Sequence, residues 1–161
     1  MRSVILLLML VSPWAMAQNP HEQAILTQAY QMAAGLINGD YKTVAAYTHP
    51  NLIRLAGGTD KVGKAFEQGK GKIRVVDVSF GKPSALVKAG KERQCVVPQT
   101  VTIQLPQGSL RTNSSLIAFS GDGGKHWVFA DTQPGIEQLR KVIPTISRKL
   151  VIPAVVVPKL M

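Results

Sequence analysis

Residues 96–131 read VVPQTVTIQLPQGSLRTNSSLIAFSGDGGKHWVFAD, and this stretch decides the fold. Apolar residues occupy odd-numbered positions from Cys95 onward: Cys95, Val97, Val101, Ile103 and Leu105. The even-numbered positions from residue 100 are polar: Thr100, Thr102 and Gln104. This alternation predicts a strand with one dry face and one wet face. Pro98 lies early in that strand and indicates a bulge or an edge position, because proline has no N–H to donate.

Two more strands are predicted within the same stretch. Pro106-Gln107-Gly108 predicts a turn into a second strand over residues 109–119, whose last four residues are apolar on both faces. We therefore expect that end of the strand to be covered on both sides. In a third strand, Trp127, Phe129 and Asp131 share one parity.

The connection into the third strand has the pattern S-x-D-x-G-x-x-W, formed by Ser120, Asp122, Gly124 and Trp127. It resembles the Asp-box hairpin that repeats in sialidase propellers, but a single copy excludes a propeller. The side chains of Ser120 and Asp122 are expected to accept hydrogen bonds from backbone donors of the turn, with the indole packed underneath. We favour this structural role over calcium or sugar binding.

Helices are predicted before residue 73 and strands after it. Asn19-Pro20 starts a first helix, Asn38-Gly39 ends it, and Asp40 can cap a second helix that Pro50 breaks. A short helical piece over residues 51–56 and a third helix over residues 60–68 follow. Residues 73–80 and 84–87 then read as strands.

The two ends of the chain have their own patterns. Residues 1–17 carry one positive charge, a short apolar run and Ala15-Met16-Ala17, which together predict a signal peptide cleaved after Ala17 and a periplasmic or secreted protein. The predicted domain is 18–149, with a last helix over residues 135–143. Residues 150–161 form an apolar tail interrupted by Pro153 and Pro158, expected to lie extended across the body or against a partner. No membrane span is expected after cleavage.

Composition limits the classes of partner. The chain has 19 Lys and Arg against 9 Asp and Glu, a net charge of +10, but the basic residues are dispersed and do not alternate with aromatic residues. A solvated basic face is predicted, and nucleic acid is not an expected partner. Cys95 is the only cysteine, so we expect no internal disulfide and a small buried side chain. The three histidines have no zinc-site spacing, and we expect no metal or cofactor.

The order of elements resembles the nuclear-transport-factor-two-like superfamily, which includes ketosteroid isomerases and polyketide cyclases. The carrying segments are Asn38-Gly39-Asp40-Tyr41, Tyr47-Thr48-His49-Pro50, Gly57-Gly58, residues 94–99 and residues 127–132. The resemblance implies an α+β fold in which a strongly curved antiparallel sheet packs on N-terminal helices. Such a cone has an open, mostly apolar cavity.

Candidate site residues follow from this cone. Asp131 would be partly buried at the strand end and act as a general base, or it would cap the following turn or pair with a surface cation. Tyr47 would donate its hydroxyl to a ligand carbonyl, and His49 would enter the cavity mouth or only terminate a helix. Arg54 would bind an anionic ligand or lie in water. Trp127 and Phe129 complete the predicted ligand-binding set.

Three functions are consistent with these patterns. The first is an exported, non-catalytic domain that binds a small apolar or amphipathic molecule or an envelope protein. The second is an isomerase, cyclase or hydratase that uses Asp131 with Tyr47 or His49. The third is an assembly module, such as a homodimer, that pairs through the C-terminal tail.

Overall fold

The computed structural model describes residues 20–69 and 74–160. The helices are α1 (Pro20–Asn38), α2 (Tyr41–Tyr47), α3 (Pro50–Leu55), α4 (Thr59–Gly69) and α5 (Ile136–Val142). The strands are β1 (Arg74–Phe80), β2 (Val87–Ala89), β3 (Glu92–Leu105), β4 (Gly108–Ser120), β5 (Val128–Asp131) and β6 (Val156–Leu160). None of the helices in the described part is long and apolar enough to cross a membrane. The predicted signal peptide lies outside the described residues.

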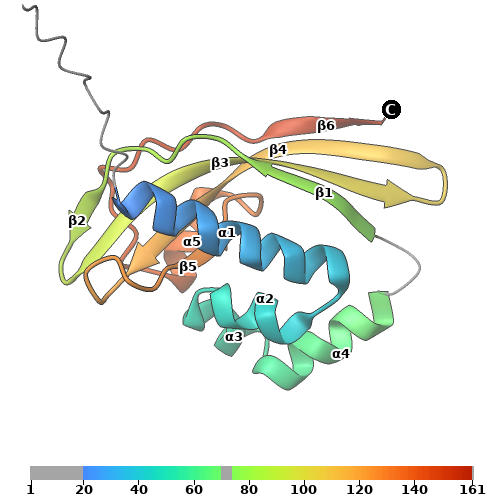
Figure 1. Ribbon diagram of the computed structural model, residues 1–161, viewed down its shortest axis with the longest axis horizontal. Helices are drawn as coiled ribbons and strands as arrows, with labels where there is room; N and C mark the ends of the chain where they lie inside the picture. The colour runs from blue at the N-terminus through green and yellow to red at the C-terminus, as the bar shows by residue number, and fades with distance from the viewer. Residues whose placement is uncertain (1–19, 70–73, 161) are drawn as a thin grey trace, which may run out of the picture.

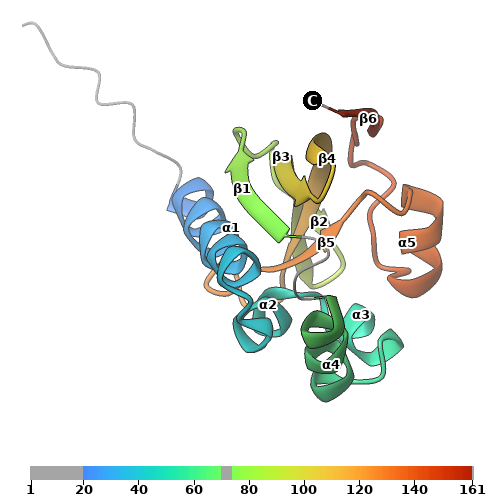
Figure 2. The same ribbon diagram turned by 90° about the vertical axis from the view of Figure 1, so that its right-hand side faces the viewer.

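The strands form one antiparallel sheet around a long β3–β4 hairpin (Figure 1). The hairpin pairs from Arg93 opposite Ser120 to Leu105 opposite Gly108. β1 and β2 share the outer edge of β3, while β5 and β6 share the outer edge of β4. The sheet curves over α1, and α2 to α4 lie below that helix (Figures 1 and 2). The α+β fold with N-terminal helices packed on a curved antiparallel sheet is therefore confirmed.

The helix boundaries depend on short local signals that the sequence shows. Gly39 has a φ of 71°, the left-handed conformation that ends α1. Asp40 then caps α2, since its carboxylate accepts hydrogen bonds from the backbone N–H groups of Lys42 and Thr43. His49 caps α3 in the same way, with Pro50 in the first turn. α1 and α2 contact the sheet, whereas α3 contacts α4 and α5.

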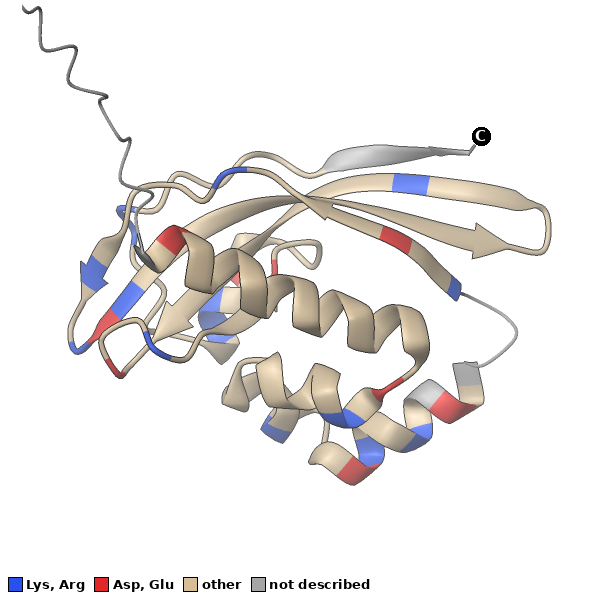
Figure 3. Cartoon of the chain, in the orientation of Figure 1, with Lys and Arg blue, Asp and Glu red and all other residues tan. Residues whose placement is uncertain are grey.

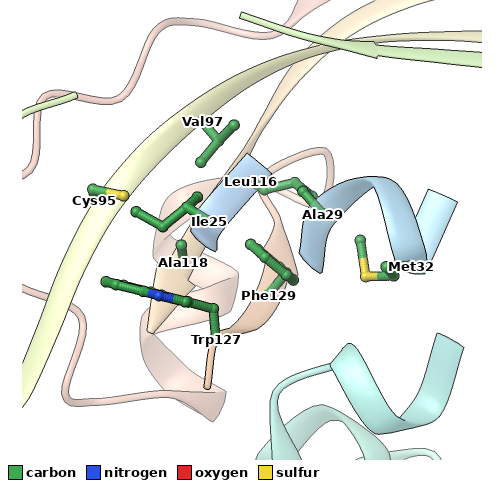
Figure 4. Packing of buried hydrophobic residues seen from close by; sticks show 9 residues of the cluster. All are labelled: Ile25, Ala29, Met32, Cys95, Val97, Leu116, Ala118, Trp127 and Phe129. Atoms are coloured by element: carbon green, nitrogen blue, oxygen red, sulfur yellow. The ribbon is translucent and has the colours of Figure 1, made fainter. Parts of the chain in front are cut away.

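The concave face of the sheet carries the main core. Ile25, Ala29 and Met32 of α1 pack on Cys95, Val97, Leu116, Ala118, Trp127 and Phe129 (Figure 4). The odd-numbered residues of β3 therefore face the interior as the alternation predicts. Cys95 is fully buried in this core, and burial raises the pKa of its thiol to about 12. Its expected role as a small buried side chain is confirmed.

A second core covers the convex face. Val96, Ile117, Phe119 and Ala130 pack against Leu139, Ile143, Ile146 and Leu150, which come from α5 and the segment after it. The end of β4 is thus covered on both sides, as predicted. In Figure 2 the sheet lies between α1 and α5. Beyond this core, β6 pairs with β4 of the same chain, with Leu110 opposite Leu160.

Pro98 lies in the gap between β1 and β2 along the edge of β3. β1 ends at Phe80 opposite Gln99, and β2 begins at Val87 opposite Gln94. The Pro98 carbonyl accepts a hydrogen bond from the N–H of Gly81, so the ring nitrogen points toward the same connection. The absence of an N–H on Pro98 is therefore tolerated, because β3 has no paired strand at this point of its edge. The prediction of a strand over residues 84–87 is wrong by about three residues, because Ser84 instead bonds Val96 and bridges the gap.

The turn after β4 has the structural role predicted for it. The hydroxyl of Ser120 accepts from the N–H of Gly124 at 2.9 Å, and the carboxylate of Asp122 accepts from the N–H groups of Lys125 and His126 at 3.0 Å. These bonds, with that of His126 the largest contribution, hold the pKa of Asp122 well below its usual range. The indole N–H of Trp127 donates to the Gly124 carbonyl, so the ring is fixed under the turn.

Candidate functional site

A cavity of about 330 Å³ lies between the concave face of the sheet and helices α1 to α3. Most of its lining is apolar: Met32, Leu36, Val44, Leu52, Val75, Val101, Ile103, Leu116 and Phe129. The polar lining residues are Thr48, Gln99, Thr112, Ser114, Asp131 and Gln133. An apolar cavity with a few polar groups on one wall is the usual form of a small-molecule site.

Asp131 is at the centre of the polar wall. Strand register brings it beside Gln99 and Ser114, because Gln99 lies opposite Ser114 on β3 and β4, and Asp131 lies opposite Leu116 on β5. The amide nitrogen of Gln99 donates to Asp131 Oδ2 at 2.7 Å and to the hydroxyl oxygen of Ser114 at 2.9 Å. The backbone N–H of Gln133 donates to Asp131 Oδ1 at 2.8 Å. The carboxylate therefore caps the turn after β5 and lines the cavity as well.

Burial raises the pKa of Asp131 above its usual value. Hydrogen bonds from the Gln133 backbone, Ser114 and Gln99 act in the opposite direction and are outweighed. The reason is that an ionised carboxylate loses more solvation in an apolar cavity than three neutral donors restore. This is the combination expected of a proton acceptor or of a group that binds a ligand.

Thr112 adds an unpaired group to the same wall. Its hydroxyl is buried and has no hydrogen-bond partner among the described residues. A buried polar atom without a partner costs about 1–3 kcal/mol in folding free energy. Thr112 and Ser114 lie on the same face of β4 and both line the cavity, so rotation of the Thr112 side chain would let a molecule in the cavity supply the missing partner.

Tyr47, His49 and Arg54 do not line this cavity. The Tyr47 hydroxyl donates to Gln31 Oε1 on the outer side of α1. The His49 ring packs edge-on against Phe119 at a centroid distance of 4.7 Å, and burial lowers its pKa, an effect that Glu92 opposes and Arg54 adds to. The exposed Arg54 donates to Asn51 Oδ1.

The two aromatic candidates have different positions. Phe129 is buried in the core and also lines the cavity, two residues before Asp131 on the same face of β5. Trp127 is 1% exposed in the core under the turn and is not among the lining residues (Figure 4). The structure thus brings Asp131 together with Phe129, but not with Tyr47, His49, Arg54 or Trp127.

The polar partners of Asp131 were not among the residues that sequence reasoning selected. Gln99 could have been selected from the sequence, because it is the one amide among the odd-numbered residues from Cys95 to Leu105, which are otherwise apolar. Thr112 and Ser114 have no comparable signal, because residues 111–115 are polar on both parities. No group of three or more His, Cys, Asp or Glu side chains within the described ranges could hold a metal ion.

Comparisons with known proteins give little further information. No family model matches the chain, and no curated protein matches it at a significant level. A solved structure of an LEH-like epoxide hydrolase from M. tuberculosis is similar, with a TM-score of 0.47 and 15% sequence identity. The similarity covers 78% of this chain and 99% of that one. A likeness at this level does not indicate what this chain binds.

Proposed function

We propose that this chain is a member of the nuclear-transport-factor-two-like superfamily that binds a small amphipathic molecule in its cone cavity. The observation that carries the proposal is the cavity itself, which is apolar over most of its wall and has one polar cluster around Asp131. At the ~30 Å³ that one water occupies in the liquid, the volume would accommodate roughly eleven non-hydrogen atoms. The ligand is therefore compact, with an apolar body and one polar end.

We further propose that binding takes place in the periplasm or outside the cell. The support is the signal-peptide pattern of residues 1–17. Cys95 is buried and is the only cysteine in the sequence, so no internal disulfide can form. Such a protein folds without a disulfide and needs none, since a domain of this length can bury its own core.

Filling the cavity should abolish binding. In Val101→Phe the added ring would occupy the space between β3 and α1, and we expect the affinity for octan-1-ol to fall by about tenfold or more. Octan-1-ol is a suitable probe because it is compact, amphipathic and uncharged. Isothermal titration calorimetry on both proteins measures the change.

The matched control is Thr102→Phe, which places the same ring on the opposite face of β3. This variant should bind octan-1-ol as the unmodified protein does. The proposal fails if the unmodified protein binds no compact amphipathic probe, or if both variants bind octan-1-ol equally well.

A second candidate function is proton transfer on the bound molecule. The half-buried carboxylate of Asp131 favours it, because burial raises the pKa and makes the group a stronger base. Asp131 would remove a proton from the carbon beside a ketone, and the unpaired Thr112 hydroxyl would donate to the resulting enolate oxygen.

Exchange of the α-protons of cyclohexanone in D2O, followed by NMR, tests this chemistry. The exchange rate should rise with pH as Asp131 loses its proton, at a pH above the usual carboxylate range, and Asp131→Asn should lower the rate by about 10²–10⁴-fold. An exchange rate equal to that of buffer alone would contradict proton transfer by Asp131, and ligand binding would remain the proposed function.

A further inference from the structure

Among the described residues that line the cavity there is one charged group and no counter-charge. Asp131 is the only ionisable side chain in that part of the lining, although the sequence has 19 Lys and Arg. Figure 3 shows the basic residues dispersed over strand ends, turns and outer helices. A carboxylate in such a protein could readily be paired by a cation from a neighbouring strand. Here its partners are an amide, a hydroxyl and a backbone N–H, all of them neutral.

The neutral partners hold the Asp131 carboxylate in place without using all of its hydrogen-bond acceptor positions. Gln99 uses its amide nitrogen on two acceptors, Asp131 and Ser114, so its orientation is fixed. An ionised carboxylate has about four acceptor positions, and the Gln99, Gln133 and Ser114 bonds leave room for at least one more donor. A molecule inside the cavity could donate to that remaining position, because Asp131 is among the lining residues.

A cationic donor would gain most from this position. A hydrogen bond between a cation and a carboxylate is about twice as strong as one between neutral groups. An anionic ligand would instead place a second negative charge in an apolar space beside Asp131. The Thr112 hydroxyl is buried and has no partner in the described structure, and rotation of its side chain toward the cavity would let it accept a further N–H of the same head group.

We propose that the ligand is a compact primary amine whose ammonium group binds the Asp131 carboxylate and whose apolar body fills the cavity between α1 and β3. This rests on the proposed function, since it names the ligand class of the same cavity. The Phe129 ring lies on the same face of β5 and would contribute a cation–π interaction to the bound ammonium group. The apolar lining residues of α1 and β3 would determine the length and shape of the body.

Three probes with the same eight-carbon body test the inference at about pH 7.5: octylamine, octan-1-ol and octanoate. Octylamine is protonated there, as a lysine side chain is. By isothermal titration calorimetry, octylamine should bind at least about tenfold more tightly than octan-1-ol, and octanoate should bind most weakly. This ranking is measured on the unmodified protein, so it does not depend on any variant being stable.

Asp131→Asn should remove the preference for the amine, so that the affinities for octylamine and octan-1-ol, measured on the same variant, come within about threefold of each other. The matched control is Asp77→Asn, which makes the same change of charge on the exposed part of β1 and should keep the tenfold preference. Equal affinity for the amine and the alcohol, or an unchanged preference in Asp131→Asn, overturns the inference while the proposed function stands. Failure of all three probes to bind overturns both.

Discussion

Replacement of Trp127 by alanine should lower the free energy of unfolding by about 3–5 kcal/mol, the range for removing a large buried aromatic side chain. Trp127 is 1% exposed and is the largest fully buried side chain of the described residues. Its ring lies under the turn after β4, and its backbone N–H donates to Gln28 Oε1 of α1 at 2.8 Å. The substitution would therefore leave a void where the turn, α1 and β3 meet.

Urea denaturation followed by circular dichroism measures this effect without depending on tryptophan fluorescence. Trp127→Phe keeps most of the apolar volume and loses the indole N–H bond to Gly124, so it should cost less than half as much. Leu55→Ala removes a side chain that is 70% exposed and should change stability by less than about 0.5 kcal/mol. Equal losses for Trp127→Ala and Leu55→Ala would show that the indole is not part of the core.

The concave half of the fold could be predicted because strand periodicity and side-chain hydrophobicity agree there. The alternation that begins at Cys95 fixes which face of β3 is dry, and the parity of Trp127 and Phe129 then places β5 on the same interior. A one-residue slip would turn every one of these side chains to the other face. The same logic identifies Asp131 as a residue that faces the cavity.

The rest of the site could not be predicted because it depends on tertiary packing. Tyr47 and His49 are close in sequence, but α2 ends between them and their side chains diverge toward Gln31 and Phe119. Strand pairing, which joins residues far apart in the chain, is what brings Gln99 to Asp131. Local spacing can indicate that Gln99 faces the interior, but it does not show that Asp131 is its partner or where Tyr47 and His49 point.

The segment that covers the convex face is attached to β3 through one buried amide, and hydrophobicity gives no indication that this polar residue is buried. Gln94 is 0% exposed, and its amide nitrogen donates to the Thr145 carbonyl at 2.9 Å and to Glu92 Oε2 at 3.0 Å. Its amide oxygen accepts from the N–H of Ser147 at 2.9 Å. Gln94 therefore joins β3 to the segment between α5 and Leu150, which covers the second core.

Gln94→Glu should lower the free energy of unfolding by about 3–5 kcal/mol at neutral pH, the cost of an uncompensated buried charge. The introduced carboxylate has the same shape and can still accept from Ser147, but it cannot donate to Thr145 and it faces the carboxylate of Glu92. Burial would raise the pKa of the introduced group above its value of about 4.3 in the unfolded chain. The folded variant would then bind more protons than the unfolded one, so its stability falls as pH rises from about 4.3 through the folded pKa.

The control for Gln94→Glu is Gln138→Glu, which makes the same chemical change on the exposed side of α5. It should alter stability by less than about 0.5 kcal/mol at any pH. Urea denaturation at about pH 4 and pH 7 should thus show a loss for Gln94→Glu that is small at the lower pH and large at the higher one. If the two variants lose the same stability at pH 7, the segment after α5 is not anchored through Gln94. The cover of the convex face would then depend on the apolar contacts of Leu139, Ile143, Ile146 and Leu150.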